Sequence, residues 1–251
     1  MRIFTEDAIE LAFIDEGEGQ PVLLIHGFGS THRVNWVDTG WVTTLNRAGY
    51  RVIAPDNRGH GASTKLYSAA DYHTALMAED AARLLAHLGI RRAAVMGYSM
   101  GARIAAFLAL ARPERVAALV LGGLGIHLVD GVGLPTTIAE AMEAESLADV
   151  LDPMGRMFRA FAEQTKADRR ALAACIRGSR QTLSREEVAQ IAQPTLVAVG
   201  TRDKIAGSAR ELAALLPAGT ALDIPDRDHN PAVGDKRFKE AVTRFLGESL
   251  A

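Results

Sequence analysis

A serine lies at the point where an apolar, strand-like run of residues gives way to a helical one. The stretch VMGYSMGARIAAFLALA (Val95–Ala111) carries Ser99 between Gly97 and Gly101. A sharp strand-to-helix turn with this spacing exposes a serine hydroxyl above a sheet, where it can act as a nucleophile. The same pattern fits a serine that only caps the following helix. Residues elsewhere in the chain have to distinguish these two interpretations.

Polar motifs also follow four other strand-like runs. They are HGFG (His26–Gly29), DNRGHGAS (Asp56–Ser63), GTRD (Gly200–Asp203) and DHN (Asp228–Asn230). Each alone is compatible with an ordinary turn, because Gly, Asp and Asn favour turns. Ligands of open parallel sheets, however, gather outside the carboxyl ends of the strands. We therefore expect these motifs and Ser99 to converge on one edge of a sheet.

The elements that must position these residues alternate between strand and helix. Most strand-like runs are apolar without alternation, which is typical of strands covered on both faces. The pattern predicts a mostly parallel sheet with helices on both faces, preceded by two antiparallel strands. The predicted strands are 2–5, 8–16, 21–27, 51–56, 93–98, 116–123, 194–200 and 220–225; the predicted helices are 42–48, 71–88, 100–111, 208–216 and 231–246.

The alternation fails once, between residues 124 and 193. This segment has no good strand pattern and is too long for a structureless loop in a compact domain. It predicts a small helical cap inserted in a core domain made of residues 1–123 and 194–251. Its predicted helices are 135–150, 153–164, 168–178 and 186–192, with helix-start signatures at Thr165-x-x-Asp168 and Ser184-x-x-Glu187.

The net charge and the cysteine content of the chain limit which partners and ligands are expected. The 251 residues have a formal net charge of −2, which favours neither nucleic acid nor anionic membranes as a partner. Cys175 is the only cysteine, so no internal disulfide forms, and no Cys/His spacing indicates a metal site. The acidic N-terminal stretch is unlike a signal peptide, and no apolar run approaches 18 residues. We expect a cytoplasmic protein with a small-molecule substrate; its oligomeric state stays open.

Taken together, the motifs HGFG, DNRGHGAS, GYSMGA, GTRD and DHN resemble those of α/β-hydrolase-fold serine hydrolases, in that family's order. The likeness covers nearly the whole chain. It implies this fold with a small helical cap, an esterase-like activity and no cofactor. In the family's order of nucleophile, acid and base, the three positions are Ser99, Asp203 and His229.

The resemblance implies a role for each site residue. His229 would take the proton of Ser99, and Asp203 would orient the imidazole and stabilise its charged form. The oxyanion would be held by the backbone N–H groups of Phe28 and Met100.

Other residues compete for two of these roles. His60 is the alternative base, although RGHG is a segment that the family uses structurally. Asp226 and Asp228 are the alternative acids, but close neighbours of a histidine on one tight turn rarely point at its Nδ1.

The expected reaction is hydrolysis of carboxylic esters of small to medium acyl chain through an acyl-enzyme. Serine at position 99 argues against related dehalogenases and epoxide hydrolases, which use aspartate there. Alternatives are carbon–carbon hydrolysis of ring-cleavage products, perhydrolysis, or a hydrolase-like ligand receptor. The stretch HGFGSTHRVNW departs from the longer glycine- and proline-bearing motif of carbon–carbon hydrolases.

The cap is expected to select the substrate. Met157, Phe158 and Phe161 share one helical face with Met154, a spacing that suits an apolar pocket. Packing of the cap onto the core explains the same spacing equally simply. Trp36, just beyond HGFG, is a further candidate for the pocket entrance.

Overall fold

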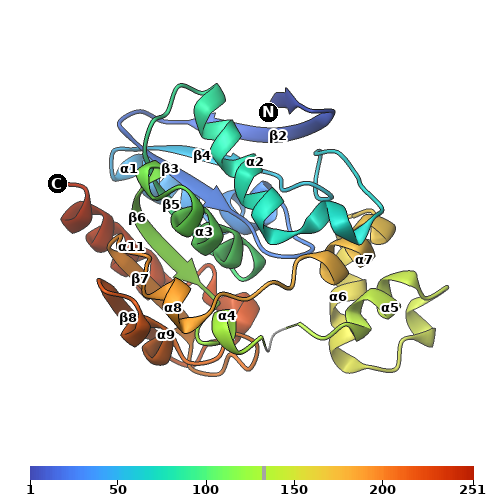
Figure 1. The fold of residues 1–251 in the computed structure, drawn as a ribbon. Coiled ribbons are helices and arrows are strands. Elements are labelled where there is room, and N and C mark those ends of the chain that lie inside the picture. The colour runs from blue at the N-terminus through green and yellow to red at the C-terminus, as the bar shows by residue number, and fades with distance from the viewer. Residues whose placement is uncertain (132–133) are drawn as a thin grey trace.

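An eight-stranded sheet forms the centre of the molecule (Figure 1). The computed structural model describes residues 1–131 and 134–251. The strand order is β1-β2-β4-β3-β5-β6-β7-β8; the pairs β1–β2 and β2–β4 are antiparallel and the other neighbouring pairs are parallel. The mostly parallel sheet confirms the predicted fold class. The strands are β1 (Arg2–Glu6), β2 (Ile9–Glu16), β3 (Gln20–Ile25), β4 (Tyr50–Pro55), β5 (Ala93–Tyr98), β6 (Val116–Gly122), β7 (Thr195–Gly200) and β8 (Gly219–Ile224).

Helices cover both faces of this sheet. Leu23 and Ile25 of β3 belong to one buried cluster, whereas Val22 and Leu24 belong to the other, because successive side chains of a strand point to opposite faces. The first cluster includes residues of α2 (Thr74–His87), α3 (Met100–Ala111) and α9 (Ala209–Leu215). The second includes residues of α1 (Trp41–Arg47) and α11 (Lys236–Ser249). Double coverage explains why the central strands are apolar throughout.

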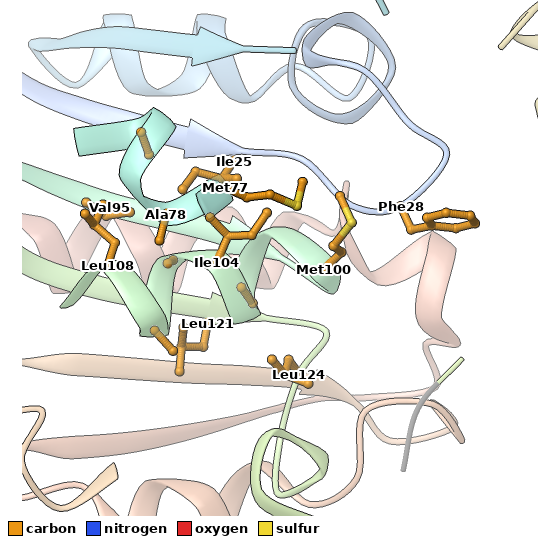
Figure 2. Packing of buried hydrophobic residues seen from close by; sticks show 14 of the residues in the cluster. Ile25, Phe28, Met77, Ala78, Val95, Met100, Ile104, Leu108, Leu121 and Leu124 are labelled. Carbon is orange, nitrogen blue, oxygen red and sulfur yellow. The ribbon is translucent and has the colours of Figure 1, made fainter. Parts of the chain in front are cut away.

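Figure 2 shows part of the first cluster. Ile104 and Leu108 of α3 lie among Val95 of β5, Leu121 of β6 and Met77 of α2. These five side chains are at most 2% exposed. Helix α3, which begins directly after Ser99, is therefore fixed against the sheet along its length.

Two predicted helices are each divided in the structure. The helix predicted at 71–88 is the 3₁₀ turn η2 (Ala69–Tyr72) followed by α2, and the one predicted at 231–246 is the short helix α10 (His229–Ala232) followed by α11. The π-helical turn η1 (Arg33–Val37) and the 3₁₀ turn η3 (Pro113–Arg115) were not predicted. No helix in the described part of the chain is long and apolar enough to cross a membrane.

Helices and helical turns are the regular secondary structure in the described part of the segment between β6 and β7. Figure 1 shows α5, α6 and α7 gathered beyond the edge of the sheet. Its elements are α4 (His127–Asp130), α5 (Thr137–Glu143), η4 (Leu147–Asp149), α6 (Pro153–Gln164), α7 (Arg169–Gly178) and α8 (Arg185–Val188). The division of the chain into a core and a separate cap at 124–193 stays a prediction.

Capping groups decide where these helices begin. Ser184 and Glu187 form the predicted capping box, with Ser184 N–H donating to Glu187 Oε2 at 2.7 Å. The signature at Thr165 is wrong: Thr165 ends α6, and its hydroxyl donates to Phe161 O at 2.9 Å. Asp168 alone starts α7, accepting from two backbone N–H groups. The predicted helix 135–150 breaks in two, because Ser146 begins a new turn with its own capping box.

The turn between β5 and α3 has no room for a side chain at either of its glycines. A Cβ atom at Gly97 would lie 2.1 Å from Gly101 O, and one at Gly101 would lie 2.0 Å from Ile25 O. Helix α3 therefore approaches β5 and β3 at backbone distance, which only glycine permits.

Gly101→Ala is expected to lower the free energy of unfolding by about 1–3 kcal/mol, because the new methyl group must push α3 away from β3. Gly247 in α11 is the matched control, since nothing lies within 4 Å of a Cβ placed there. Gly247→Ala is expected to raise the free energy of unfolding by about 0.5–1 kcal/mol through helix propensity. Urea unfolding followed by circular dichroism measures both; equal effects at the two glycines would contradict the packing argument.

Candidate active site

Ser99 lies at the tip of the turn between β5 and α3. Its backbone has φ +54° and ψ −114°, a conformation that residues other than glycine rarely adopt. Its N–H donates to Gly122 O at 2.8 Å, and its carbonyl accepts from Arg103 N–H at 3.1 Å. The side chain makes no capping hydrogen bond with α3. The hydroxyl is thus available for another partner.

That partner is His229, which lies at the start of α10. The Ser99 hydroxyl is 3.0 Å from His229 Nε2, and His229 Nδ1 is 2.7 Å from Asp203 Oδ2. When Nδ1–H donates to the carboxylate, Nε2 carries the lone pair that accepts the serine proton. The three side chains come from the ends of β5, β7 and β8, which share one edge of the sheet.

The Asp203 carboxylate is fully buried and held from both sides. One oxygen accepts from the His229 ring, and the other accepts from the N–H groups of Ile205 and Ala206 at 2.8 and 3.1 Å. These bonds fix the carboxylate in the plane where it can orient the imidazole.

Tyr98 also supports the histidine, and sequence reasoning missed it. Its hydroxyl donates to the backbone carbonyl of His229 at 2.5 Å, and the two ring centroids are 5.6 Å apart. Burial, together with the nearby Asp203 charge, raises the pKa of Tyr98 well above its ordinary value, so the phenol keeps its proton. The residue just before Ser99 thereby fixes the backbone that carries the base.

The two predicted oxyanion donors are Met100, at the start of α3, and Phe28, in the loop after β3. Met100 is the first residue of α3, where N–H groups lack an intrahelical acceptor. In the loop after β3, Gly27 N–H donates to Asn35 Oδ1 at 3.0 Å and Gly29 N–H donates to His60 Nε2 at 3.1 Å. Phe28 N–H, between them, donates to no other group in the described part of the protein.

His60 and His26 occupy structural positions rather than that of a base. Nδ1–H of His60 donates to Arg58 O at 3.0 Å, while its Nε2 accepts from Gly29 N–H. Burial and the nearby His26 lower the pKa of His60 to about 3. Burial also lowers the pKa of His26, whose Nε2 accepts from Asn57 N–H at 2.9 Å. Both rings are neutral, with their nitrogens engaged by the backbone.

The competing carboxylates point elsewhere. Asp226 is exposed and pairs with Arg202 at 2.8 Å. Asp228 is exposed at the start of α10 and makes no capping bond. Only Asp203, among these three, contacts the His229 ring.

Two cavities meet at Ser99. The larger spans about 850 Å³, its opening to solvent included, and is lined by Ser99 and His229 together with Phe28 and the predicted pocket residues Met157, Phe158 and Phe161. The Phe28 and Phe158 rings are 5.8 Å apart, so α6 lies over the loop that carries the first predicted oxyanion donor. The smaller spans about 540 Å³, its opening to solvent included, and is lined by Ser99, Met100, Arg103, Ile176 and Arg180, among others.

Trp36 does not belong to this pocket. It is fully buried in the second core cluster, with its ring 6.2 Å from that of Trp41. The π-helical turn η1 directs Trp36 inward and leaves its neighbours Val34 and Asn35 on the lining of the larger cavity. The prediction failed because sequence spacing does not reveal this turn.

No group of three or more His, Cys, Asp or Glu side chains placed to hold a metal ion occurs among residues 1–131 and 134–251. The arrangement that the described residues do form is a hydroxyl, an imidazole and a buried carboxylate in series.

Comparisons with known proteins agree with this architecture. Residues 20–136 match the family model described as alpha/beta hydrolase fold. "Putative non-heme bromoperoxidase BpoC" of Mycobacterium tuberculosis is 34% identical over 247 residues, which span 88% of this chain and 91% of that protein. A hydrolase from Pseudomonas aeruginosa PA01 has a TM-score of 0.80 at 28% identity, covering 98% of both chains. A thermophilic esterase from Thermogutta terrifontis has a TM-score of 0.77 at 27% identity, covering 96% of this chain and 94% of that one.

The sheet order, the strand-end site and the full-length likeness to these proteins lead to one assignment: the chain belongs to the alpha/beta hydrolase fold family and is a hydrolase.

Proposed function

We propose that the protein is a serine hydrolase that cleaves carboxylic esters of small to medium acyl chain through an acyl-enzyme. The observation that carries this proposal is the series Ser99 hydroxyl, His229 Nε2 at 3.0 Å, and His229 Nδ1 at 2.7 Å from buried Asp203. The likeness to a thermophilic esterase is a second observation that supports ester chemistry.

In the acylation step, His229 Nε2 takes the Ser99 proton while Oγ attacks the ester carbonyl. The carbonyl oxygen becomes an oxyanion that accepts from the N–H groups of Phe28 and Met100; each such donor typically contributes ~3–4 kcal/mol to transition-state stabilisation. His229 then protonates the departing alcohol oxygen as the carbon–oxygen bond breaks. Water, deprotonated by His229, attacks the acyl-enzyme and releases the acid and Ser99.

The lining of the larger cavity supports acyl chains of limited length. Phe28, Phe158, Phe161 and Met157 make its wall apolar, and each buried methylene contributes about 0.8 kcal/mol. Rates rise with chain length until the cavity is filled and fall when the chain meets the wall.

Perhydrolysis is a second candidate, favoured by the likeness to the BpoC protein. Hydrogen peroxide would replace water as the nucleophile on the acyl-enzyme and would release a peracid and Ser99. A peracid oxidises bromide, which connects this triad to bromination without a haem. Peracid formation in the presence of peroxide, compared with acid formation in its absence, distinguishes the two reactions.

A fluorophosphonate probe is expected to label the protein once, on Ser99, and to leave Ser99→Ala unlabelled. Ser30 lines the same cavity without contacting His229, so Ser30→Ala is expected to retain the label. Intact-mass spectrometry measures both. If the Ser99→Ala variant is still labelled, Ser99 is not the nucleophile.

Asp203→Asn is expected to leave the fold intact and to lower kcat by about 10⁴, as in serine proteases, because the amide favours the wrong imidazole tautomer. Asp226→Asn and Asp228→Asn serve as matched controls and are expected to change kcat less than about threefold, since neither contacts the ring in the described structure. Steady-state kinetics on a p-nitrophenyl ester provide the measurement. A fully active Asp203→Asn would show that the acid lies elsewhere.

Phe158→Ala is expected to shift the preferred acyl chain, otherwise between about two and eight carbons, towards longer chains, because it removes part of the cavity wall. Met154→Ala on the same helix is the control: Met154 packs against the core, so only stability is expected to fall. A series of p-nitrophenyl esters measures kcat/KM against chain length. If the preferred chain length is unchanged in Phe158→Ala, Phe158 only packs the interior and does not limit the substrate. Cleavage of a ring-cleavage dienone with no ester turnover would favour the carbon–carbon reaction.

A further inference from the structure

The smaller cavity beside Ser99 is lined by two arginines and by no acidic residue. Arg103 and Arg180 are its only charged lining residues in the described part of the chain. Neither guanidinium forms an ion pair with a described carboxylate within 4.0 Å. The two residues outside the description, at positions 132 and 133, are valine and glycine, which carry no carboxylate.

Arg103 is held by backbone carbonyls alone. Its Nη1 donates to Gln181 O at 2.6 Å and its Nη2 donates to His127 O at 3.3 Å. A guanidinium has five N–H donors, so others remain free for a ligand. Carbonyl oxygens orient the group but do not neutralise its charge.

Two buried arginines of this protein are paired differently. Arg58 is bound by both oxygens of Asp80 at 2.6 Å, and Arg159 by Glu163 at 2.7 Å. Burying a charge without a counter-charge is costly, and these pairs follow that rule. Arg103 is only partly exposed and has no carboxylate partner of this kind in the described structure. Burial and the neighbouring Arg180 charge lower its pKa to about 10, which still leaves it protonated at neutral pH.

The Arg103 guanidinium lies close in the chain to the Ser99 hydroxyl, the proposed reacting group. Arg103 lies one helical turn after Ser99, and its N–H donates to Ser99 O at 3.1 Å. Residues four apart lie on the same face of a helix, which is consistent with both lining the cavity. Ser99 also lines the larger, mostly apolar cavity, so a substrate bonded to Ser99 can extend one part into each.

We infer that the smaller cavity binds a carboxylate of the substrate through Arg103 and Arg180, so that the protein acts on esters carrying an anionic group a short chain away from the reacting carbonyl. Arginine forks match the geometry of a carboxylate and form charge-assisted hydrogen bonds with it. This inference deepens the proposed function and rests on Ser99 as the reacting residue. The anion occupies the smaller cavity, and the apolar part of the ester occupies the larger one.

Binding to Ser99→Ala tests the inference without turnover. Two pairs of esters differ only in a terminal carboxylate or methyl group: monomethyl glutarate against methyl pentanoate, and 4-acetoxybutanoate against butyl acetate. The first pair places the carboxylate on the acyl side and the second on the alcohol side. By calorimetry, the anionic member of at least one pair is expected to bind about 10-fold tighter or more.

That preference is expected to disappear when Arg103→Met or Arg180→Gln is added. Arg180 is exposed, and its described side-chain hydrogen bond is to Leu134 O, so we expect Arg180→Gln to fold. This variant therefore tests the inference even if Arg103→Met does not fold. Arg177→Gln is the control: it removes the same charge from the neighbouring helix, but Arg177 is already paired with Glu143. It is expected to leave the preference unchanged.

Kinetics in the protein with Ser99 separate a binding role from a structural one. Arg103→Met is expected to raise KM for the preferred anionic ester about 10-fold more than it raises KM for the neutral partner. Equal losses on both esters, or no anionic preference in either pair, would overturn the inference. Binding of the anionic ester to Ser99→Ala without any ester turnover in the intact protein would instead reject the proposed function and leave the anion site in place.

Discussion

The close contact between helix α3 and strand β3 at Gly101 is the constraint on which the site depends. A Cβ at Gly101 would lie only 2.0 Å from Ile25 O, so α3 and the end of β3 pack at backbone distance. The contact places Met100, the first residue of α3, beside the end of β3 at Ile25, from which the loop leads to Phe28. In the proposed mechanism an oxyanion accepts from Phe28 and Met100 at once, and these residues come from segments more than 70 residues apart. A fixed helix-to-strand distance would then serve the proposed chemistry as well as packing.

A network of neutral histidines holds the other half of that arrangement. His60 accepts from Gly29 N–H and Asn35 accepts from Gly27 N–H, so the backbone on both sides of Phe28 is already bound. A charged His60 would offer Gly29 a donor in place of an acceptor, and its burial prevents this by lowering its pKa to about 3. The motif RGHG thus contributes to the active site by orienting a peptide group, not by moving a proton.

The sheet and the strand ends that carry the motifs were predictable for a clear physical reason. Strands buried on both faces are continuous apolar runs, and their ends are marked by glycine and polar residues, so both signals are local. The order and roles of Ser99, Asp203 and His229 came from the resemblance to the hydrolase family. The cap signature at Ser184 was equally local and was confirmed, whereas Thr165 shows that the same four-residue pattern can end one helix instead of starting the next.

What the sequence did not predict depends on contacts between distant segments. Tyr98 reads as the last apolar residue of a strand, yet its hydroxyl binds the carbonyl of His229, 131 positions away. Asn35 reads as a loop residue until η1 turns it towards Gly27. Trp36 was assigned to the pocket because it follows HGFG closely, but the same turn buries it. No periodicity in one sequence encodes these directions.

Arg103 lies where the sheet edge meets the helical segment that follows β6. The sheet edge supplies Ser99, Asp203 and His229, while the helical segment between β6 and β7 supplies Phe158 and much of the cavity walls. Arg103 comes from α3 yet donates to carbonyls of that helical segment, at His127 and Gln181.

The residue therefore connects the position of the inserted segment to a charge one helical turn from the nucleophile. An anion bound between Arg103 and Arg180 would offset the repulsion between two cations that face the same cavity, and would strengthen the contact of the insertion with α3. Substrate binding and the placement of the insertion over the site are then coupled through one guanidinium. A neutral ester, which leaves that repulsion in place, gains only the apolar contacts of the larger cavity.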